Sequence, residues 1–180
     1  MFLICDIIKI MRKKLLKLSI LFYLSFLILS VTKAEAFNQR KLALSETLKT
    51  EKACVSCELS NTDLSGLNLV HADLRMAVLY NVKMERVNLK GANLKGAILY
   101  GSNLRSANLS EANLTGTDLR QANLANANLK GANLTGVILY KTNLTDTDLT
   151  GAILKYAVLD GTIFCRTIRP SGQEDNTGCR

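Results

Sequence analysis

The sequence predicts an all-β solenoid, a chain of short extended segments that coils back over itself. Its main signal is a leucine-like residue at every fifth position from Leu59 to Phe164, 22 in one register, of which 20 are leucine. Two positions before each of these centres stands a mostly small residue, alanine in eleven of the 22 units. A longer period of twenty residues is also visible. A period of five fits neither a helix nor a plain strand, so the chain is a repeat architecture.

Each five-residue unit predicts one short strand followed by a turn. The small residue and the leucine are two positions apart, so both point to the same side of an extended segment. The residue before the centre is Asn or Asp in 14 of the 22 units, and the residue two after it is Gly in nine. Glycine accepts a positive φ, and Asn and Asp tolerate it, which favours a tight turn. A continuous helix would scatter the leucines around its axis and carry many poor helix formers.

The period of twenty sets the number of units in a coil. At positions separated by multiples of twenty, aliphatic residues replace Asn or Asp before the centre, and tyrosines or one arginine follow it: Val78, Ile98, Ile138 and Val158, then Tyr80, Tyr100, Arg120 and Tyr140. Positions twenty apart therefore share one environment, which predicts a four-sided solenoid with four units per coil. The 22 units make about 5.5 coils, a rod of about 26 Å at roughly 4.8 Å per stacked strand.

The repeated text resembles the pentapeptide-repeat family, whose pattern is A(D/N)LXX. The resemblance is carried by units such as Ala92-Asn93-Leu94-Lys95-Gly96, Ala107-Asn108-Leu109-Ser110-Glu111 and Ala132-Asn133-Leu134-Thr135-Gly136. It covers about 110 of the 180 residues, and we assign residues 57–165 to the repeat domain. The resemblance implies a right-handed quadrilateral β-helix with the leucines stacked inside. The handedness comes from the resemblance, because the spacing does not fix it.

Residues 1–36 have the pattern of an export signal. A basic segment ends at Lys17, and residues 18–31 are 14 uncharged residues, the length of a signal core and short of the roughly 20 that span a bilayer. Ala34-Glu35-Ala36 then fits a cleavage site, which predicts a mature chain that starts at Phe37 in the periplasm or outside the cell. The alternative is an uncleaved anchor, the one way in which we expect the chain to contact a membrane. Either Met1 or Met11 could be the initiator.

Residues 37–56 are expected to form an N-terminal helix and a cysteine turn. Residues 38–53 contain neither Gly nor Pro, and Leu44 and Leu48 are four apart, as on one face of a helix. Solenoids need a cap, because an uncovered end exposes core leucines and unpaired strand edges. We therefore predict a short helix that caps the first coil, with a partner-binding helix as the alternative.

Cys54 and Cys57 favour a local disulfide if the chain is exported to an oxidising compartment. Free or intermolecular thiols are the next alternative. A thioredoxin-like redox site would need a surrounding βαβ pattern, which the sequence lacks. A zinc site would need four ligands, and His71 is the only histidine.

The tail, residues 166–180, leaves the five-residue register. It resembles a tail of exported bacterial pentapeptide proteins, in which an FC…P-x-G…C pattern closes the last coil, and this implies a bond between Cys165 and Cys179. Closing that loop would stabilise the fold by about 3 kcal/mol on the chain-entropy model. A bond from either residue to Cys54 or Cys57 is disfavoured, because those lie at the other end of the rod.

The sequence contains no nucleophile–base pair, phosphate loop or metal-ligand cluster, so we expect neither an enzyme nor a cofactor. The candidate site is an outward surface, hereafter the Val/Ile/Tyr face, formed by Val78, Tyr80, Ile98, Tyr100, Arg120, Ile138, Tyr140 and Val158. Rings on adjacent coils would lie about 5 Å apart and form an aromatic stripe. Such stripes often mark protein contacts. Cross-coil packing that only stabilises the solenoid is the alternative.

Two functions remain at this stage. The first is an exported, non-enzymatic scaffold that binds a protein or envelope partner, or a second copy of itself, through the Val/Ile/Tyr face. The second is the topoisomerase-protecting DNA mimicry known in the resembling family. The whole chain has a net charge of +8, but without residues 1–36 it has 23 − 6 = 17 basic and 15 − 2 = 13 acidic residues, a net of +4. DNA mimicry needs an acidic surface, so we expect no role with nucleic acid.

Overall fold

The computed structural model describes residues 35–39 and 41–179, so most of the predicted signal segment lies outside the described residues. The chain divides into two units, Met1–Arg40 and Lys41–Arg180. In the first unit, residues 35–39 are helical, and the expected cleavage junction between Ala36 and Phe37 lies within this turn of helix. Within the described ranges, no helix combines the length and the apolar character needed to span a bilayer.

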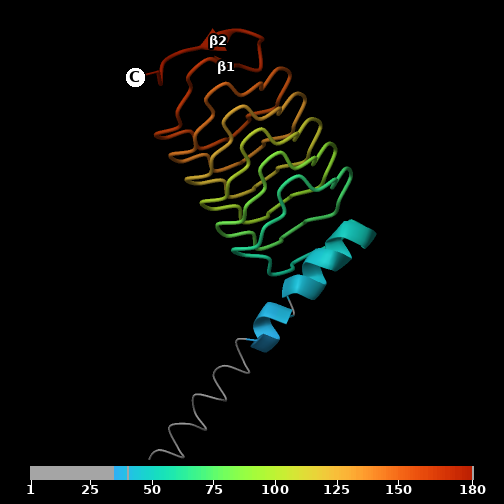
Figure 1. The fold of residues 1–180 in the computed structure, drawn as a ribbon. Helices are drawn as coiled ribbons and strands as arrows, with labels where there is room; N and C mark the ends of the chain where they lie inside the picture. Colours follow the sequence, from blue (N-terminus) through green and yellow to red (C-terminus); the bar gives the residue numbers. More distant parts are fainter. Residues whose placement is uncertain (1–34, 40, 180) are drawn as a thin grey trace, which may run out of the picture. The chain divides into compact units, whose positions relative to one another are not determined.

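The second unit begins with a helix over residues 41–51 (Figure 1). Leu48 of this helix is fully buried in the hydrophobic core, and Leu44 packs against the same core. The Lys41 Nζ donates a hydrogen bond of 2.5 Å to the Ser60 carbonyl oxygen. The helix ends at Glu51, two residues before the expected end at 53, because the backbone changes to a positive φ of 50° at Lys52.

The walls of the solenoid are parallel pairings between residues twenty apart, in a series that runs from Ala53–Asp73 to Asp148–Ile168. Each pairing involves the residue before a centre, and its ladder bonds are short. The Asn93 N–H donates to the Ala72 carbonyl and the Leu94 N–H to the Asn113 carbonyl, both at 2.8 Å. Each wall segment is therefore a one-residue bridge, the shortest form of the predicted short strand, because the turn begins at once.

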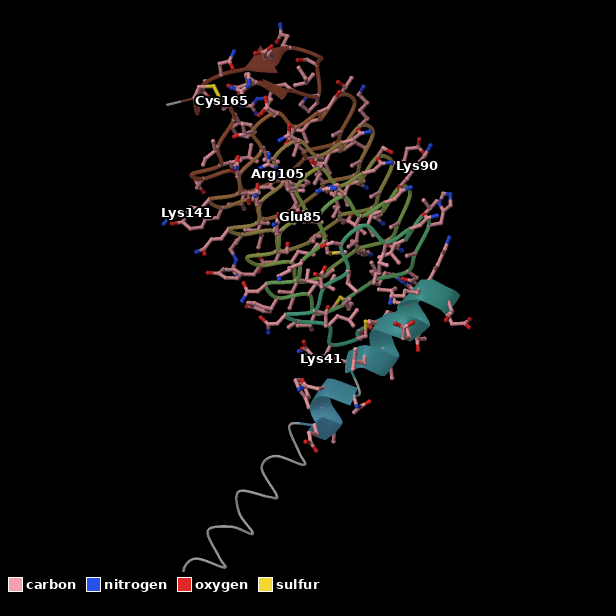
Figure 2. All side chains as sticks on the ribbon, viewed as in Figure 1. Lys41, Glu85, Lys90, Arg105, Lys141 and Cys165 are labelled. Atoms are coloured by element: carbon pink, nitrogen blue, oxygen red, sulfur yellow. A yellow bond between two sulfur atoms is a disulfide. The ribbon has the colours of Figure 1, made fainter. Side chains whose placement is uncertain are left out.

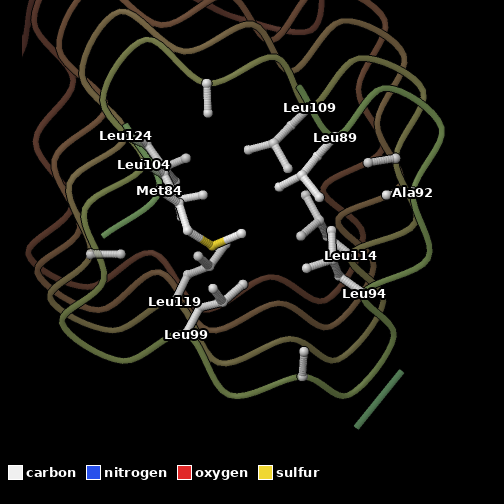
Figure 3. Packing of buried hydrophobic residues seen from close by; sticks show 14 of the residues in the cluster. Met84, Leu89, Ala92, Leu94, Leu99, Leu104, Leu109, Leu114, Leu119 and Leu124 are labelled. Carbon is white, nitrogen blue, oxygen red and sulfur yellow. The ribbon is translucent and has the colours of Figure 1, made fainter. Parts of the chain in front are cut away.

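The core is a stack of leucines from all four walls (Figure 3). Met84 lies in this stack and is fully buried. Its unit is the least regular in sequence, with charged residues on both sides of the methionine, yet it keeps the regular ladder. The Met84 and Arg86 N–H groups donate to the next coil at 2.8 and 2.9 Å, as in the regular units. The flexible methionine side chain fills the space of a leucine without disturbing the ladder.

The corner of each unit requires a left-handed backbone. The residue two after the centre has a positive φ in all 22 units, at glycines and at larger residues such as Met76 and Tyr156. The glycine preference read from the sequence therefore has the expected cause, since glycine takes this conformation without strain.

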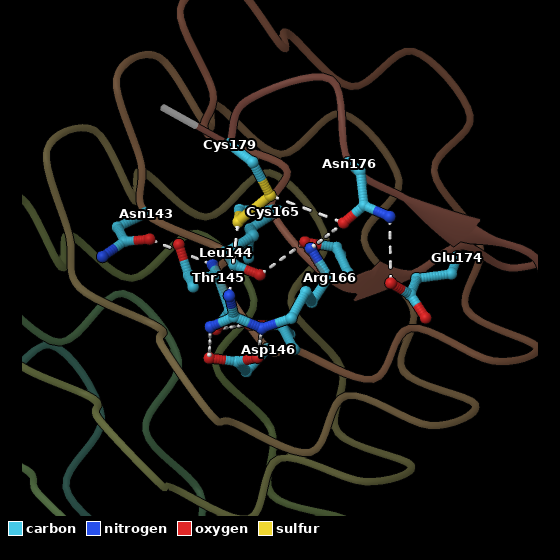
Figure 4. A network of polar contacts seen from close by, with 11 residues as sticks. Asn143, Leu144, Thr145, Asp146, Cys165, Arg166, Glu174, Asn176 and Cys179 are labelled. Carbon is cyan, nitrogen blue, oxygen red and sulfur yellow. Dashed lines mark hydrogen bonds and ion pairs between the residues drawn. A yellow bond between two sulfur atoms is a disulfide. The ribbon is translucent and has the colours of Figure 1, made fainter.

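Two regular strands occur at the C-terminal end of the described chain. β1 (Thr167–Ile168) continues one wall and pairs antiparallel with β2 (Glu174–Asp175) of the tail. The disulfides are Cys54–Cys57 and Cys165–Cys179, with Cα–Cα distances of 5.4 and 4.6 Å. Near the second disulfide, the Arg166 N–H donates to Asn176 and the Arg166 guanidinium binds Asp146 (Figure 4).

Candidate interaction face

The backbone places the Val/Ile/Tyr face on one wall of the solenoid. Its aliphatic residues and Asp118 are successive partners in the parallel ladder: Val78, Ile98, Asp118, Ile138 and Val158. The leucine between each aliphatic residue and the tyrosine or arginine after it points inward. Leu99, which lies between Ile98 and Tyr100, is fully buried. The structure thus brings the predicted face residues together on one wall.

The aromatic part of the face is a stack across coils. The Tyr80 and Tyr100 ring centroids are 5.4 Å apart with the rings tilted by 39°. The Arg120 Cζ lies 5.6 Å from the Tyr100 centroid, within the range of a cation–π contact. From the sequence alone, Arg120 interrupts the stripe. In the structure it extends the stack, because its guanidinium group covers the next ring.

Asp118 holds Arg120 in this position. The Arg120 Nε and Nη2 donate to the two Asp118 carboxylate oxygens at 2.9 and 2.7 Å. Burial raises the pKa of Asp118, but the hydrogen bonds and charge of Arg120 outweigh it, so this pKa lies below its ordinary value. The pKa of Arg120 is raised mainly by the same hydrogen bonds. The pair therefore stays ionised at neutral pH and fixes a planar cation beside the tyrosines.

On the other three walls, hereafter the polar walls, the residue before the centre is mostly Asn or Asp. The side chain of this residue makes hydrogen bonds that the sequence analysis did not predict. The Asn93 side-chain oxygen accepts from the Lys95 N–H at 3.2 Å, and Asn108 accepts from the Ser110 N–H at the same distance. The same side chains also connect coils, since the Asn108 Nδ2 donates to the Asn88 Oδ1. The Asn and Asp residues in the sequence were a signal for these bonds, because both residue types favour hydrogen bonds to the backbone two residues further on.

An aliphatic residue before the centre has no side-chain oxygen to accept from the backbone N–H two residues further on. On the Val/Ile/Tyr face, the Tyr80 N–H donates to the Ser60 Oγ at 3.2 Å instead. In the described part of the chain, no group accepts from the N–H of Tyr100 or Tyr140. The face therefore loses backbone hydrogen bonds that the polar walls keep, and it gains apolar surface.

The Val/Ile/Tyr face is accessible to solvent, and a positively charged side chain lies beside Tyr140. Tyr80 and Tyr140 are each 38% exposed, and Tyr100 and Ile98 are half-buried. The Lys141 Nζ lies 5.1 Å from the Tyr140 centroid, and the Lys141 side chain projects from the surface (Figure 2). Exposed aromatic side chains together with arginine are typical of protein-binding surfaces.

The other residues considered from the sequence lie apart from this face. His71 is exposed at a corner with a φ of 59°. Over residues 35–39 and 41–179, no three His, Cys, Asp or Glu side chains are grouped so that they could hold a metal ion.

A solenoid of stacked five-residue units, four to a coil, defines the class of this molecule as a repeat protein. The chain belongs to the pentapeptide-repeat family: the pentapeptide-repeats profile matches residues 57–96, 88–126, 102–139 and 127–165, with eight copies. Family membership implies the right-handed quadrilateral β-helix. No curated protein matches the chain.

Among solved structures, the chain is similar to HetL of the cyanobacterium Nostoc sp. strain PCC 7120, a protein involved in the regulation of heterocyst differentiation. The identity is 29% and the TM-score 0.66, over 68% of this chain and 57% of HetL. The chain therefore spans less than two thirds of HetL. A protein of the Arabidopsis thaliana thylakoid lumen is 36% identical over 54% of this chain and 64% of its own, with a TM-score of 0.39. QnrB1, a plasmid-mediated fluoroquinolone resistance protein, is 20% identical over 62% and 60%, with a TM-score of 0.31.

Proposed function

We propose that this chain is an exported, non-enzymatic binding protein that holds a protein or envelope partner against its Val/Ile/Tyr face. The observation that carries this proposal is the accessible stack of Tyr80, Tyr100 and Arg120 beside a column of aliphatic residues. Tyrosine and arginine are the residue types that most often dominate binding energy at protein interfaces.

The hydrogen-bond pattern of the face supports binding over packing. An Asn at position 98 or 138 could accept from the N–H of the residue two further on, as Asn93 and Asn108 do. Such a bond contributes about 1 kcal/mol. The face instead carries half-exposed aliphatic side chains, which gain little from burial within the monomer. Their full gain would come when a partner covers them.

The remaining parts of the proposal concern the chain ends. The sequence of residues 1–36 supports export with cleavage after Ala36, and two disulfides suit an oxidising compartment. The mature protein would then be a β-helix of about 5.5 coils, with helix 41–51 as its N-terminal cap. N-terminal sequencing of the exported chain should give Phe37, and a start at Met1 or Met11 would disprove cleavage. Loss of residues 41–51 should cause aggregation.

Site-specific photocrosslinking tests the binding face. A photoreactive phenylalanine at Tyr100 should give a defined adduct in the native host envelope, and the same group at Thr115 should not. Thr115 follows its centre as Tyr100 does, but it lies on a polar wall. The adducted partner should then bind the purified chain and should lose affinity for the Tyr100→Glu variant. Equal crosslinking from both positions, or unchanged affinity of Tyr100→Glu, would refute the proposed site.

A further inference from the structure

The last coil of the solenoid is less covered than any earlier one. Its centre residues Leu154 and Leu159 are only partly buried, whereas the centres from Leu59 to Leu149 are fully buried. Around them, Ile153 is 52% exposed and Tyr156 is 75% exposed. Apolar surface is therefore concentrated at this end of the second unit.

The same part of the coil is an open sheet edge. One coil earlier, the N–H groups of Leu134, Gly136 and Leu139 donate at 2.8 Å to carbonyl oxygens of the last coil, and the N–H of Lys141 donates at 3.0 Å. In the described chain, the equivalent N–H groups of the last coil have no acceptor: Leu154, Tyr156, Leu159 and Gly161. Unpaired edge groups of this kind are a template for another chain.

The other half of the last coil is covered by the tail. β2 lies along β1 in antiparallel pairing, and the Gly178 N–H donates to the Phe164 carbonyl at 2.7 Å. The guanidinium carbon of Arg169 lies 3.8 Å from the centroid of the Phe164 ring, and the Cys165–Cys179 disulfide ties down the end of the tail. One half of the last coil, which contains Leu154 and Leu159, is therefore uncovered and is called the bare half below. The other half is covered by the tail.

The composition of the last coil also differs from the coils before it. Earlier coils carry an aliphatic residue before the centre only on the wall of the Val/Ile/Tyr face. The last coil carries one on all four walls: Ile153, Val158, Ile163 and Ile168. Polar Asn and Asp, which suit a wall that meets water, are absent from these four positions.

The bare half and the tail carry side chains of opposite charge. On the bare half, the Lys155 Nζ lies 4.8 Å from the Tyr156 ring centroid and makes no ion pair among the described residues. On the tail, Glu174 is exposed and accepts a hydrogen bond from the Asn176 Nδ2 at 3.0 Å, again with no ion pair in the described part.

We propose that the bare half of the last coil binds the tail of a second copy of this chain across a two-fold axis. The axis would place the tail of each copy on the open edge of the other, so that both edges and both sets of apolar residues are covered at once. It would also bring Lys155 of each copy to Glu174 of the other. Because a two-fold contact uses the same C-terminal surface of both copies, association closes at two copies instead of extending into a filament.

The test is the solution mass of the processed, oxidised full chain, measured by light scattering over a dilution series. The unmodified protein should have the mass of a dimer. Lys155→Glu and Tyr156→Asp should each halve the mass, and the double variant Lys155→Glu/Glu174→Lys should restore it. Lys95→Glu is the matched control and should leave the dimer intact, because Lys95 occupies the same place in its unit on the same wall, three coils earlier. Thermal unfolding checks that each variant is folded.

Several results would overturn the proposal: a monomer at every concentration, a dimer that survives both Lys155→Glu and Tyr156→Asp, or a failed charge reversal. A dimer dissociated only by Tyr100→Glu would place self-association on the Val/Ile/Tyr face. The inference goes beyond the proposed function and does not depend on it. Crosslinking from Tyr100 in the Lys155→Glu background tests partner binding separately, so either idea can fail alone.

Discussion

The Val/Ile/Tyr face and the polar walls share one backbone and one interior but use their outward positions differently. On a polar wall, Asn108 accepts a hydrogen bond from its own turn and donates one to the adjacent coil. On the Val/Ile/Tyr face, Ile98 does neither, and the neighbouring Tyr100 stacks between Tyr80 and Arg120. The inward leucines thus specify the fold, and the outward pair of positions is free to specify a surface.

The largest expected effect tests whether the two kinds of wall have equivalent interiors. Leu99 lies under the Val/Ile/Tyr face and Leu109 lies under a polar wall, and both are fully buried. Leu99→Ala and Leu109→Ala should each lower the free energy of unfolding by about 2–5 kcal/mol, since each leaves a cavity in the same stack. Denaturant titration measures both. A much smaller loss for Leu99→Ala would mean that the face is supported by something other than the common core.

The next prediction separates binding from packing on the Val/Ile/Tyr face. Asn108→Ala removes an acceptor from the Ser110 N–H and should cost about 1 kcal/mol. Ile98→Asn should change stability by less than about 1 kcal/mol, because the acceptor gained for the Tyr100 N–H offsets the lost apolar contact. It should nevertheless abolish photocrosslinking from Tyr100. If Ile98→Asn destabilises the protein as much as a core truncation does, the face serves internal packing.

A smaller effect is expected beneath a polar wall, where two residues of one interior column differ in their hydrogen bonds. The Thr142 Oγ1 donates to the Leu119 carbonyl at 2.7 Å. Ser102, two coils earlier in this column, is buried, and its Oγ has no partner among the described residues.

Ser102→Thr should therefore raise the free energy of unfolding by about 0.5–1 kcal/mol, because a threonine at this position can donate to the Leu79 carbonyl. Ser102→Ala is the control and should be close to neutral, since it removes a hydroxyl that is already unsatisfied. The denaturant midpoint measures both changes. A loss of stability in Ser102→Thr would show that the column has no room for the extra methyl group.

Much of this architecture could be predicted because the residue types at each position of the repeat determine it. A small residue and a leucine two apart, followed by a glycine-rich corner, determine which side chains face inward and where φ is positive. The period of twenty identified the ladder partners, so the members of the Val/Ile/Tyr face could be named from spacing alone. The disulfides in the structure are the pairs that the sequence favoured.

Features that depend on individual side chains or on chain ends could not be predicted in this way. The position of Arg120 over Tyr100 depends on the bidentate contact with Asp118, which spacing does not encode. The regular ladder at Met84 could not be predicted either, because composition cannot show how a flexible side chain fills a leucine site. The half-covered last coil depends on where the tail lies, and the tail has left the repeat.

The smallest effect concerns acid stability, and it compares one ion pair on each kind of wall. Asp118 pairs with Arg120 on the Val/Ile/Tyr face, and Asp73 pairs with Arg75 on a polar wall, with side chains that are 15% and 33% exposed. Burial raises the pKa of Asp118, but its hydrogen bonds and the charge of Arg120 lower it further. The pKa of Asp73 is lowered chiefly by the Arg75 hydrogen bond. Both pKa values therefore lie below the ordinary 3.8.

A carboxyl group whose pKa is lowered by folding stabilises the protein above its unfolded pKa, and this stabilisation is lost as the pH falls through the folded pKa. The thermal midpoint should therefore be level above pH 3.8 as far as these two groups are concerned, and should fall below that pH. Asp118→Asn should flatten this fall more than Asp73→Asn does, because the less exposed pair is less screened by water. Equal pH profiles for the two variants would show that the Arg120 pair is no better protected than an ordinary surface pair. The guanidinium group beside Tyr100 would then be held too loosely to act as a fixed element of the Val/Ile/Tyr face.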